Sequence, residues 1–415
     1  MKKTSLWMMA WRNLGRNRRR TLLTLASIAF GVFLAIFSMA AQDRNWQDMI
    51  DLGARMGGGH VTVQHPEYLD TPSLSRTVTG TDALIAAAAG GDEVDRAVER
   101  ISGQLMVSTA RESYGASFIA FDPEAEDSTT LSYLEAVSEG EMFAADDATG
   151  VVLGAQLARN LGAELGDRVV YTATDRNGDI VAGLGRVRGI LRTGAPSIDV
   201  GMVLLPIEAV RDVLGFAPDE ATQVALFITD HRRSEALAAR LQGQLGDEAA
   251  AVPWFEGRPD LYAFIAMKVG GGVIMIGVIA LMVAAGIFNT VFVSVMERLR
   301  EFGIMMAVGF SPAKLFRLVV YESLWLGVIG LVLAGMLTIG PYLYLNQVGI
   351  DMGTMLGDNP TEISGVAMAT QLRFGIYPEN AVRIVVLAFV AVVLAGIYPA
   401  WRAGRVEPVE SIRLG

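Results

Sequence analysis

The chain has 415 residues, of which 52% are hydrophobic and 19% are charged, and its formal net charge is −10. Soluble domains carry about 25% charged residues, so some segments must be strongly apolar, and the mean hydropathy of +0.39 argues against a wholly soluble globular protein. The absence of cysteine excludes disulfides and thiolate metal sites, and three scattered histidines give no metal-binding pattern.

The charge is divided unevenly along the chain. Residues 1–20 hold seven Lys and Arg and no acid, whereas residues 42–268 hold 18 basic and 35 acidic residues. A basic tip beside an apolar run indicates contact with anionic lipid headgroups or a cytoplasmic terminus. The acidic balance of the long middle segment argues against nucleic-acid binding, so we expect membrane lipids but no nucleic acid as partners.

The first 41 residues predict a surface helix followed by a membrane span. Segment 1–20 is basic, and its apolar residues have the spacing of an interfacial amphipathic helix: Leu6, Trp7, Met8, Trp11 and Leu14. Residues 21–41 carry no charge and are long enough to cross about 30 Å of hydrocarbon. Residues 38–40 resemble a signal-peptide cleavage site, but the apolar run exceeds the roughly 7–15 residues of a signal-peptide core. We therefore expect a retained first span.

Residues 42–268 predict a mixed α/β domain between the first and second spans, and the interleaving of its elements favours two subdomains over a sandwich. β-rich runs predict strands at 60–64, 101–110, 116–121, 168–174, 180–191, 202–205 and 223–229. Helical patterns cover 82–89, 153–163, 207–214 and 233–245. Asn177-Gly178 between two strands indicates a hairpin. Between Pro259 and Met296 glycine is the sole helix breaker, which predicts a continuous helix.

Three further apolar runs predict spans at 269–296, 315–345 and 381–401, separated and followed by segments 297–314, 346–380 and 402–415. Segments 1–20, 297–317 and 402–415 together carry 14 Lys and Arg, whereas 346–380 carries only Arg373. The positive-inside rule then places both termini and 297–314 in the cytoplasm. Segments 42–268 and 346–380 are then expected on the extracytoplasmic side.

Two polar side chains, Asn289 and Glu322, lie inside or near the predicted spans. A buried carboxylate is costly in a membrane, so a polar partner is expected, unless Glu322 lies at the cytoplasmic interface. Small residues recur at helical spacing in the second and third spans, among them Gly277, Gly330 and Gly335. Such spacing allows helices to approach closely, either within the chain or at a dimer seam.

Patterns for catalysis are weak. The stretch from Asp175 to Asp179 superficially resembles a calcium loop, but its glycine is misplaced for an EF-hand, so a turn is the better interpretation. No G-x-x-x-x-G-K-[ST] sequence is present, so any ATP that drives the protein must bind on another chain. We expect a non-catalytic subunit without a cofactor of its own.

Several stretches resemble the FtsX-like/MacB-type family of ABC transporter permeases. MERLREFGIMMAVGF at 296–310 resembles the family's sequence after the second span, and YPAWRA at 398–403 with EPVESIR at 407–413 resembles its C-terminal ending. FDP at 121–123, VLG at 152–154 and GD at 166–167 are similar to its periplasmic core. The resemblance implies an α-helical membrane protein with four transmembrane helices. It also implies a mixed α/β, MacB-like periplasmic core inserted between the first and second helices.

The resemblance further implies a division of labour. Two permeases, identical or paralogous, would sit over a dimer of ABC ATPase subunits that bind ATP–Mg, and nucleotide-driven closure would be transmitted to the periplasmic domain (mechanotransmission). The coupling element would be the cytoplasmic helix, whose charged residues contact the ATPase while its apolar residues fill a groove. The residues expected there are Glu297, Arg298, Arg300, Glu301, Phe302, Gly303, Ile304 and Met305. A plain basic loop that only obeys the positive-inside rule is the alternative.

The layout is closest to the lipoprotein-releasing permeases of this family, whose sequence after the first span resembles GHVTVQ at 59–64. The loop with Thr193, Gly194 and Asp199 is similar to their outer domain and is a candidate site for a carrier or substrate. The expected function is therefore lipoprotein release from the inner membrane, with a periplasmic carrier or outer-membrane component as a candidate partner. Export of another hydrophobic or amphiphilic substrate, and signalling to a periplasmic partner, remain the alternatives.

Overall fold

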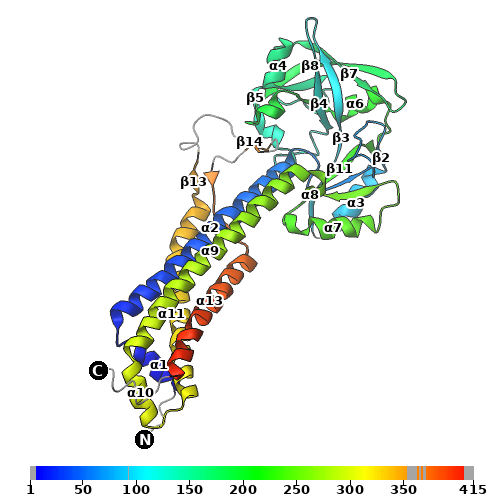
Figure 1. Cartoon of the computed structure of the whole chain (residues 1–415). Helices are drawn as coiled ribbons and strands as arrows, with labels where there is room; N and C mark the ends of the chain where they lie inside the picture. The colour runs from blue at the N-terminus through cyan, green and yellow to red at the C-terminus, as the bar shows by residue number, and fades with distance from the viewer. Residues whose placement is uncertain (1–5, 92, 353–361, 364–365, 368–370, 406–415) are drawn as a thin grey trace. The chain divides into compact units, whose positions relative to one another are not determined.

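The computed structural model describes residues 6–91, 93–352, 362–363, 366–367 and 371–405. The chain divides into two units (Figure 1). The helical unit comprises Met1–Asn45, Ala266–Met352 and Gln371–Gly415, and the α/β unit comprises Trp46–Ile265 and Gly353–Thr370. The motif at 407–413, most of the predicted tail 402–415 and part of the predicted loop 346–380 lie outside the described residues.

Four helices of the described chain are long and apolar enough to cross a membrane: α2 (Arg18–Arg55), α9 (Pro259–Glu297), α11 (Pro312–Gln347) and α13 (Pro378–Gly404). They confirm the predicted four-span membrane protein, and α9 confirms the predicted continuous helix. The helical unit also contains the short helices α1 (Leu6–Leu14) and α10 (Leu299–Ala307) and the strand pair β13 (Ile350–Asp351) and β16 (Gln371–Leu372).

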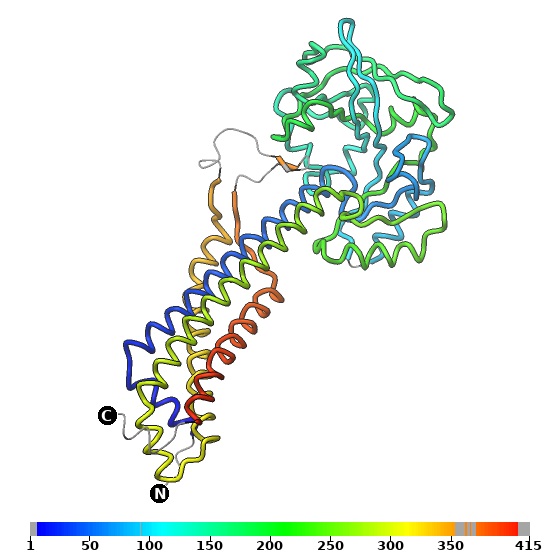
Figure 2. The backbone as a smooth tube through the Cα atoms, viewed as in Figure 1, coloured from blue at the N-terminus to red at the C-terminus, as the bar shows by residue number. Residues whose placement is uncertain are grey.

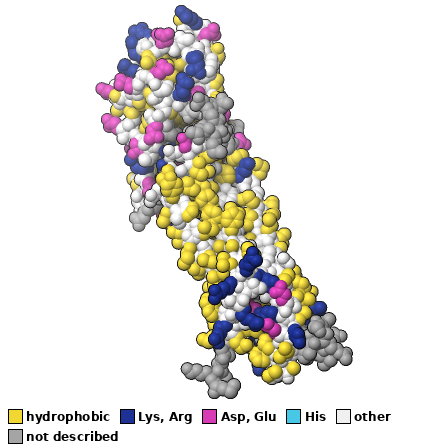
Figure 3. All heavy atoms as spheres, turned by 90° about the vertical axis from the view of Figure 1, so that its left-hand side faces the viewer, with side chains coloured by type: hydrophobic (Ala, Val, Ile, Leu, Met, Phe, Trp, Pro, Cys, Tyr) yellow, Lys and Arg dark blue, Asp and Glu magenta, His cyan; other side chains and the backbone are white. Residues whose placement is uncertain are grey.

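The long helices present an apolar surface. Figure 3 shows hydrophobic side chains covering them in a broad band, with Lys and Arg gathered beyond the band toward the chain termini. Ile274 and Leu281 of α9 and Met336 of α11 are among the exposed large side chains of this band. Apolar surface this extensive marks a membrane-facing or protein-facing region.

Small residues allow close helix packing inside this unit. α2 and α9 run side by side (Figure 2), with Gly31 against Val283. A side-chain carbon built at Gly330 of α11 would stand 2.6 Å from Ile28 of α2, so a larger residue would force the two helices apart. Gly335, by contrast, has no neighbouring atom within 4 Å of such a carbon. Some residues of the predicted small-residue pattern therefore allow helices to pack within the chain, and others lie on the outer surface of the helices.

The α/β unit is built on one ten-stranded β-sheet. Nine of its strands follow the order β12-β1-β11-β3-β4-β9-β6-β8-β5, and the tenth, β7, pairs with both β3 and β8. The ten strands are β1 (Val61–Gln64), β3 (Val94–Ser108), β4 (Ser113–Phe121), β5 (Val137–Gly140), β6 (Gly150–Gly154), β7 (Arg168–Thr174), β8 (Ile180–Leu191), β9 (Met202–Pro206), β11 (Gln223–Ile228) and β12 (Ala250–Pro253). Two separate pairs are β2 (Val78–Thr79) with β10 (Glu220–Ala221), and β14 (Glu362–Ile363) with β15 (Val366–Ala367). The helices are α3 (Thr81–Ala89), α4 (Ala155–Leu161), α5 (Pro196–Asp199), α6 (Ile207–Leu214), α7 (Ser234–Gln242) and α8 (Trp254–Gly257), with 3-10 turns η1 (Ser132–Ala136) and η2 (His231–Arg233).

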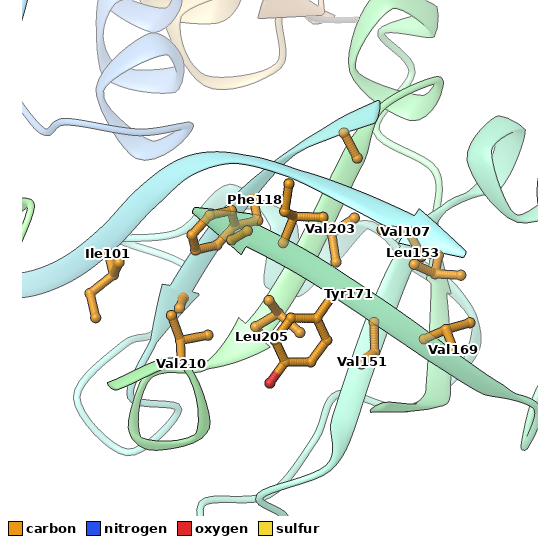
Figure 4. Packing of buried hydrophobic residues seen from close by; sticks show 14 of the residues in the cluster. Ile101, Val107, Phe118, Val151, Leu153, Val169, Tyr171, Val203, Leu205 and Val210 are labelled. Carbon is orange, nitrogen blue, oxygen red and sulfur yellow. The ribbon is translucent and has the colours of Figure 1, made fainter. Parts of the chain in front are cut away.

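The sheet has two parts that share the 15-residue strand β3. In the first part, β3-β4-β9-β6-β8-β7 closes on itself because β7 pairs with both β8 and β3. Figure 4 shows side chains such as Phe118, Leu153 and Leu205 filling its interior. In the second part, α3 and α7 pack over β12-β1-β11-β3 around a separate apolar cluster that includes Val224 and Leu237.

Each predicted strand and helix of this unit overlaps an observed element. The predicted hairpin is confirmed: β7 and β8 are antiparallel around Asn177-Gly178, and Gly178 has φ 88°, a value that favours glycine. The helix predicted from residue 153 begins instead at Ala155, because residues 150–154 form the buried strand β6 between β8 and β9.

Candidate coupling site

The chain turns sharply after α9. Arg298 leaves helical geometry at φ −104° and ψ 7°, and α10 then runs from Leu299 to Ala307. Gly309 has φ 101°, which lets the chain reverse, and Pro312 stands in the first turn of α11, where its missing N–H is not needed. The predicted coupling segment 297–314 is thus a short helix and a turn between two candidate membrane spans.

A buried carboxylate lies beside this turn. Glu322 of α11 is 8% exposed. Its Oε1 accepts a hydrogen bond from Nδ2 of Asn13 at 2.6 Å and another from Nη1 of Arg298 at 3.0 Å. The guanidinium carbon of Arg298 also lies 5.0 Å from the ring centre of Phe302. The partners expected for Glu322 are therefore within the chain: Asn13 joins α11 to α1, and Arg298 joins it to the residue that precedes α10.

Two ion pairs link the basic N-terminal segment to the same turn. Arg16 donates two hydrogen bonds to the carboxylate of Glu301, at 2.7 and 2.9 Å, and Arg20 donates one to Glu297 at 2.5 Å. The hydrogen bond from Arg16 is the main reason that the pKa of Glu301 lies below its usual value. Exposed pairs such as these are screened by water and contribute little to stability. Arg16 contacts α10 through Glu301, and Arg20 contacts the last residue of α9 through Glu297.

Aromatic side chains attach α1 to α11. The ring of Trp325 lies 4.5 Å from that of Trp7 and 4.7 Å from that of Trp11, and Trp7 also meets Tyr321 edge to face at 5.4 Å. Tryptophan and tyrosine concentrate where a membrane meets water. The amphipathic helix predicted for the first 20 residues is therefore present as α1, and it packs against a candidate membrane span.

The predicted coupling residues divide into an inner and an outer set. Phe302 is fully buried and Gly303 is buried, and Met305 packs against the apolar interior of the helical unit. Ile304 is 50% exposed, and Arg300 is also exposed. The structure thus turns Phe302 inward, away from the groove of a partner, because its ring completes the helical unit's own core.

Two other predicted sites lie elsewhere. Asn289 of α9 is exposed, and no hydrogen bond from another described residue reaches its side chain. In the predicted carrier loop, Oδ1 of Asp199 accepts hydrogen bonds from the backbone N–H of Thr193 at 2.9 Å and from its hydroxyl at 2.8 Å. Gly194 supplies the turn with φ 77°. Asp199 is buried, so its carboxylate holds the loop together rather than facing outward.

Sequence reasoning missed the N-terminal half of this site. It assigned the basic residues of 1–20 to lipid or topology, whereas Arg16 and Arg20 pair with two acids of the coupling turn and Asn13 reaches Glu322. One pattern could have indicated the pairing. Glu297 and Glu301 are the acidic residues of the otherwise basic segment 297–314 and lie four residues apart, and Arg16 and Arg20 have the same spacing.

Two family models match the chain. The model of the FtsX-like permease C-terminal region matches residues 273–408, and the model of the MacB-like periplasmic core domain matches residues 21–244, more than half of the chain. The chain belongs to the FtsX-like family of ABC transporter permeases that carry a MacB-like periplasmic core. The resemblance of the sequence motifs and the expected architecture are thereby confirmed.

The relatives of this chain differ in the functions that their names give. The chain is 26% identical over 277 residues to the lipoprotein-releasing system transmembrane protein LolC of Xylella fastidiosa, a match that spans 63% of this chain and 64% of LolC. It is 23% identical over 437 residues to an uncharacterized ABC transporter permease of Methanocaldococcus jannaschii, across 100% of this chain and 98% of that one. It is 24% identical over 438 residues to the macrolide export ATP-binding/permease protein MacB of Nitrobacter winogradskyi, across 98% of this chain and 60% of MacB.

Proposed function

We propose that this chain is the membrane-embedded subunit of an ABC transporter that couples ATP hydrolysis on a separate ATPase to work done by its α/β unit. Its sequence has no P-loop, so the nucleotide binds on the partner. Two permeases assemble over an ATPase dimer in the bacterial inner membrane. Both termini and α10 face the cytoplasm, and the α/β unit faces the periplasm.

The main observation behind this proposal is that one side of α10 contacts other residues of this chain, whereas its opposite side is exposed. Phe302 and the pair between Arg298 and Glu322 hold it to α11, and Glu301 pairs with Arg16, which follows α1. On the outer side Arg300, Ile304 and Val308 follow one another at four-residue spacing, and Val308 is 80% exposed. An exposed helical face that combines a charge with apolar anchors suits the groove of another protein, and we assign the ATPase subunit to it.

The inner contacts give a route for mechanical coupling. Ion pairs and a buried aromatic ring hold α10 against α11, so a displacement of α10 by the closing ATPase dimer also displaces α11 and α1. Packed elements transmit such shifts because a close-packed interior does not compress. The work then reaches the periplasmic side through the helices, with no channel required.

The outer surface of α9 supports a pair of permeases. Asn289 is exposed on a helix whose surroundings are apolar, and no intrachain hydrogen bond of the described residues satisfies its amide. Gly270, Gly271 and Gly277 on the same helix have no neighbouring atom within 4 Å of a built side-chain carbon. Polar amides and small residues on lipid-facing helices are both typical of helix–helix interfaces in a membrane. We assign this face of α9 to the second permease.

The substrate class that we favour is a lipoprotein, released from the inner membrane toward a periplasmic carrier. Its support is the LolC relatives and the loop at 193–199, in which Ser197 of α5 also bonds to Glu362 of β14. The full-length match to MacB supports export of another amphiphile as the alternative. Depletion of the chain in its host separates the two: lipoproteins retained in the inner membrane support release, and normal lipoprotein sorting contradicts it.

The ATPase assignment is tested by a matched pair of surface variants. Ile304→Asp places a charge on the exposed face of α10, whereas Ile180→Asp does the same at an 80% exposed residue of the α/β unit. We expect Ile304→Asp to weaken binding of the co-expressed ATPase to the full chain at least tenfold and Ile180→Asp to leave it unchanged. Equal binding by both variants would contradict the assignment.

A further inference from the structure

The α/β unit contains a cavity of about 180 Å³ that is separate from the coupling site. It is enclosed by the end of α2 and the glycine turn that follows it, by β1, and by the residues that join α8 to α9. Leu69 and Gly257 line it and are themselves exposed, so the cavity reaches the protein surface. Its walls combine apolar side chains, such as Ile50 and Leu261, with a small number of polar groups.

One wall of this cavity carries a cation without a counter-ion. Arg258 donates a hydrogen bond from Nη1 to the carbonyl oxygen of Gly53 at 2.9 Å, and no carboxylate of the described residues pairs with it. Burial lowers the pKa of Arg258 below its usual value, because the charged guanidinium is poorly solvated. Among the described residues that line the cavity, Arg258 alone is charged, in a unit whose sequence is rich in acids.

A second donor lines the same cavity. Gln64 of β1 is 5% exposed, and its amide Nε2 has no hydrogen-bond partner in the described structure. Neighbouring polar groups are already used: the hydroxyl of Tyr68 donates to the carbonyl of Ser102 at 2.7 Å, and Nε2 of Gln223 donates to the hydroxyl of Ser102 at 2.9 Å. A buried donor without a partner is costly and rare in native proteins, so a ligand acceptor is expected there.

We infer that this cavity binds an oxyanion, a phosphate group carried by a small molecule or by a lipid headgroup. The planar guanidinium of Arg258 supplies paired donors of the kind that phosphate accepts, and Gln64 also lines the cavity. The volume exceeds that of a phosphate alone, and the apolar wall formed by Ile50 and Leu261 suits an attached carbon chain. This inference stands independently of the ATPase and lipoprotein assignments.

The test is equilibrium binding to the purified full chain in a non-ionic detergent, with three probes: radiolabelled inorganic phosphate, short-chain phosphatidic acid, and short-chain diacylglycerol as the control without phosphate. Saturation by both phosphate probes identifies a free anion as ligand, and saturation by phosphatidic acid alone identifies a headgroup. Saturation by neither, or equally by diacylglycerol, overturns the inference.

Variants make the assignment specific. Arg258→Gln should raise the Kd at least tenfold, whereas Arg111→Gln, which changes an exposed arginine of the same unit, should leave it unchanged. Gln64→Leu should weaken binding severalfold and, in the absence of ligand, raise the Tm, because it removes an unsatisfied buried amide. Because Gln64→Leu is expected to bind more weakly while it unfolds at a higher temperature, this variant tests the site even if Arg258→Gln does not fold. Unchanged binding in Gln64→Leu, or in a folded Arg258→Gln, would refute the site.

Discussion

Removal of one charge from the Arg298–Glu322 pair should destabilise the helical unit far more than removal of both. Arg298→Met leaves the Glu322 carboxylate in place with only the Asn13 amide as partner. Breaking a fully buried pair costs about 3–5 kcal/mol. The side chains of Arg298 and Glu322 are 17% and 11% exposed, so we expect a loss of about 2–3 kcal/mol for Arg298→Met. Glu322→Leu should lose less than Arg298→Met, because Arg298 still donates to Glu301 at 3.4 Å. The double variant Arg298→Met, Glu322→Leu should lose less than about 1 kcal/mol, since no charge remains unpaired.

The assay is thermal unfolding of the purified chain in detergent, followed by circular dichroism, with the double-mutant cycle as the readout. Arg300→Met is the matched control, because Arg300 is exposed and lies two residues from Arg298; we expect a change within about 0.5 kcal/mol. Single variants as stable as Arg300→Met, or a double variant that loses the sum of the two single losses, would refute the reasoning.

Three further predictions concern packing, the dimer and pH. Gly330→Val should destabilise the helical unit by about 1–3 kcal/mol through its clash with Ile28, whereas Gly335→Val should be nearly neutral; thermal unfolding compares them. In crosslinking experiments, Asn289→Leu should shift the purified permease from dimer to monomer. The control Asn380→Leu, which changes an amide that donates to Asp43 of the same chain, should leave the dimer intact. A stable Asn289→Leu dimer would contradict the proposed dimer interface on α9. The pKa of Glu301 is lower in the folded state, so its contact with Arg16 stabilises the fold above the ordinary carboxyl pKa, and this stabilisation is lost as the pH falls through the lowered pKa. Isotope-edited spectroscopy should show that Arg16→Met raises the pKa of Glu301. An unchanged pKa would contradict the ion pair.

Much of the architecture follows from local sequence patterns. Apolar runs of span length, Val- and Ile-rich strands and the Asn177-Gly178 turn each specify an element through physics that acts over a few residues. Tertiary arrangement lies beyond such patterns. The closure of β7 onto β3, and the inclusion of residues 150–154 as a strand, depend on pairing between segments far apart in the chain.

The candidate site shows the same division. The motif at 296–310 contains α10, for which we predict a coupling role, and the cost of a buried carboxylate predicted a partner for Glu322. The inward orientation of Phe302 could not be read from the motif, because it depends on α11 and α13 packing around it. Arg16 and Arg20 were missed since a basic N-terminus already has a sufficient explanation in the positive-inside rule.

The most direct test of the account is the ATP hydrolysis rate of the complex reconstituted in lipid, with the native chain, with Glu301→Lys, and with the charge-exchanged pair Arg16→Glu, Glu301→Lys. We predict that Glu301→Lys abolishes the stimulation of the ATPase while the α/β unit stays folded, and that the exchanged pair restores much of it by re-forming the contact with reversed charges. Full stimulation in Glu301→Lys, or hydrolysis of ATP by the purified chain alone, would contradict the claim that α10 couples a partner's hydrolysis to this chain.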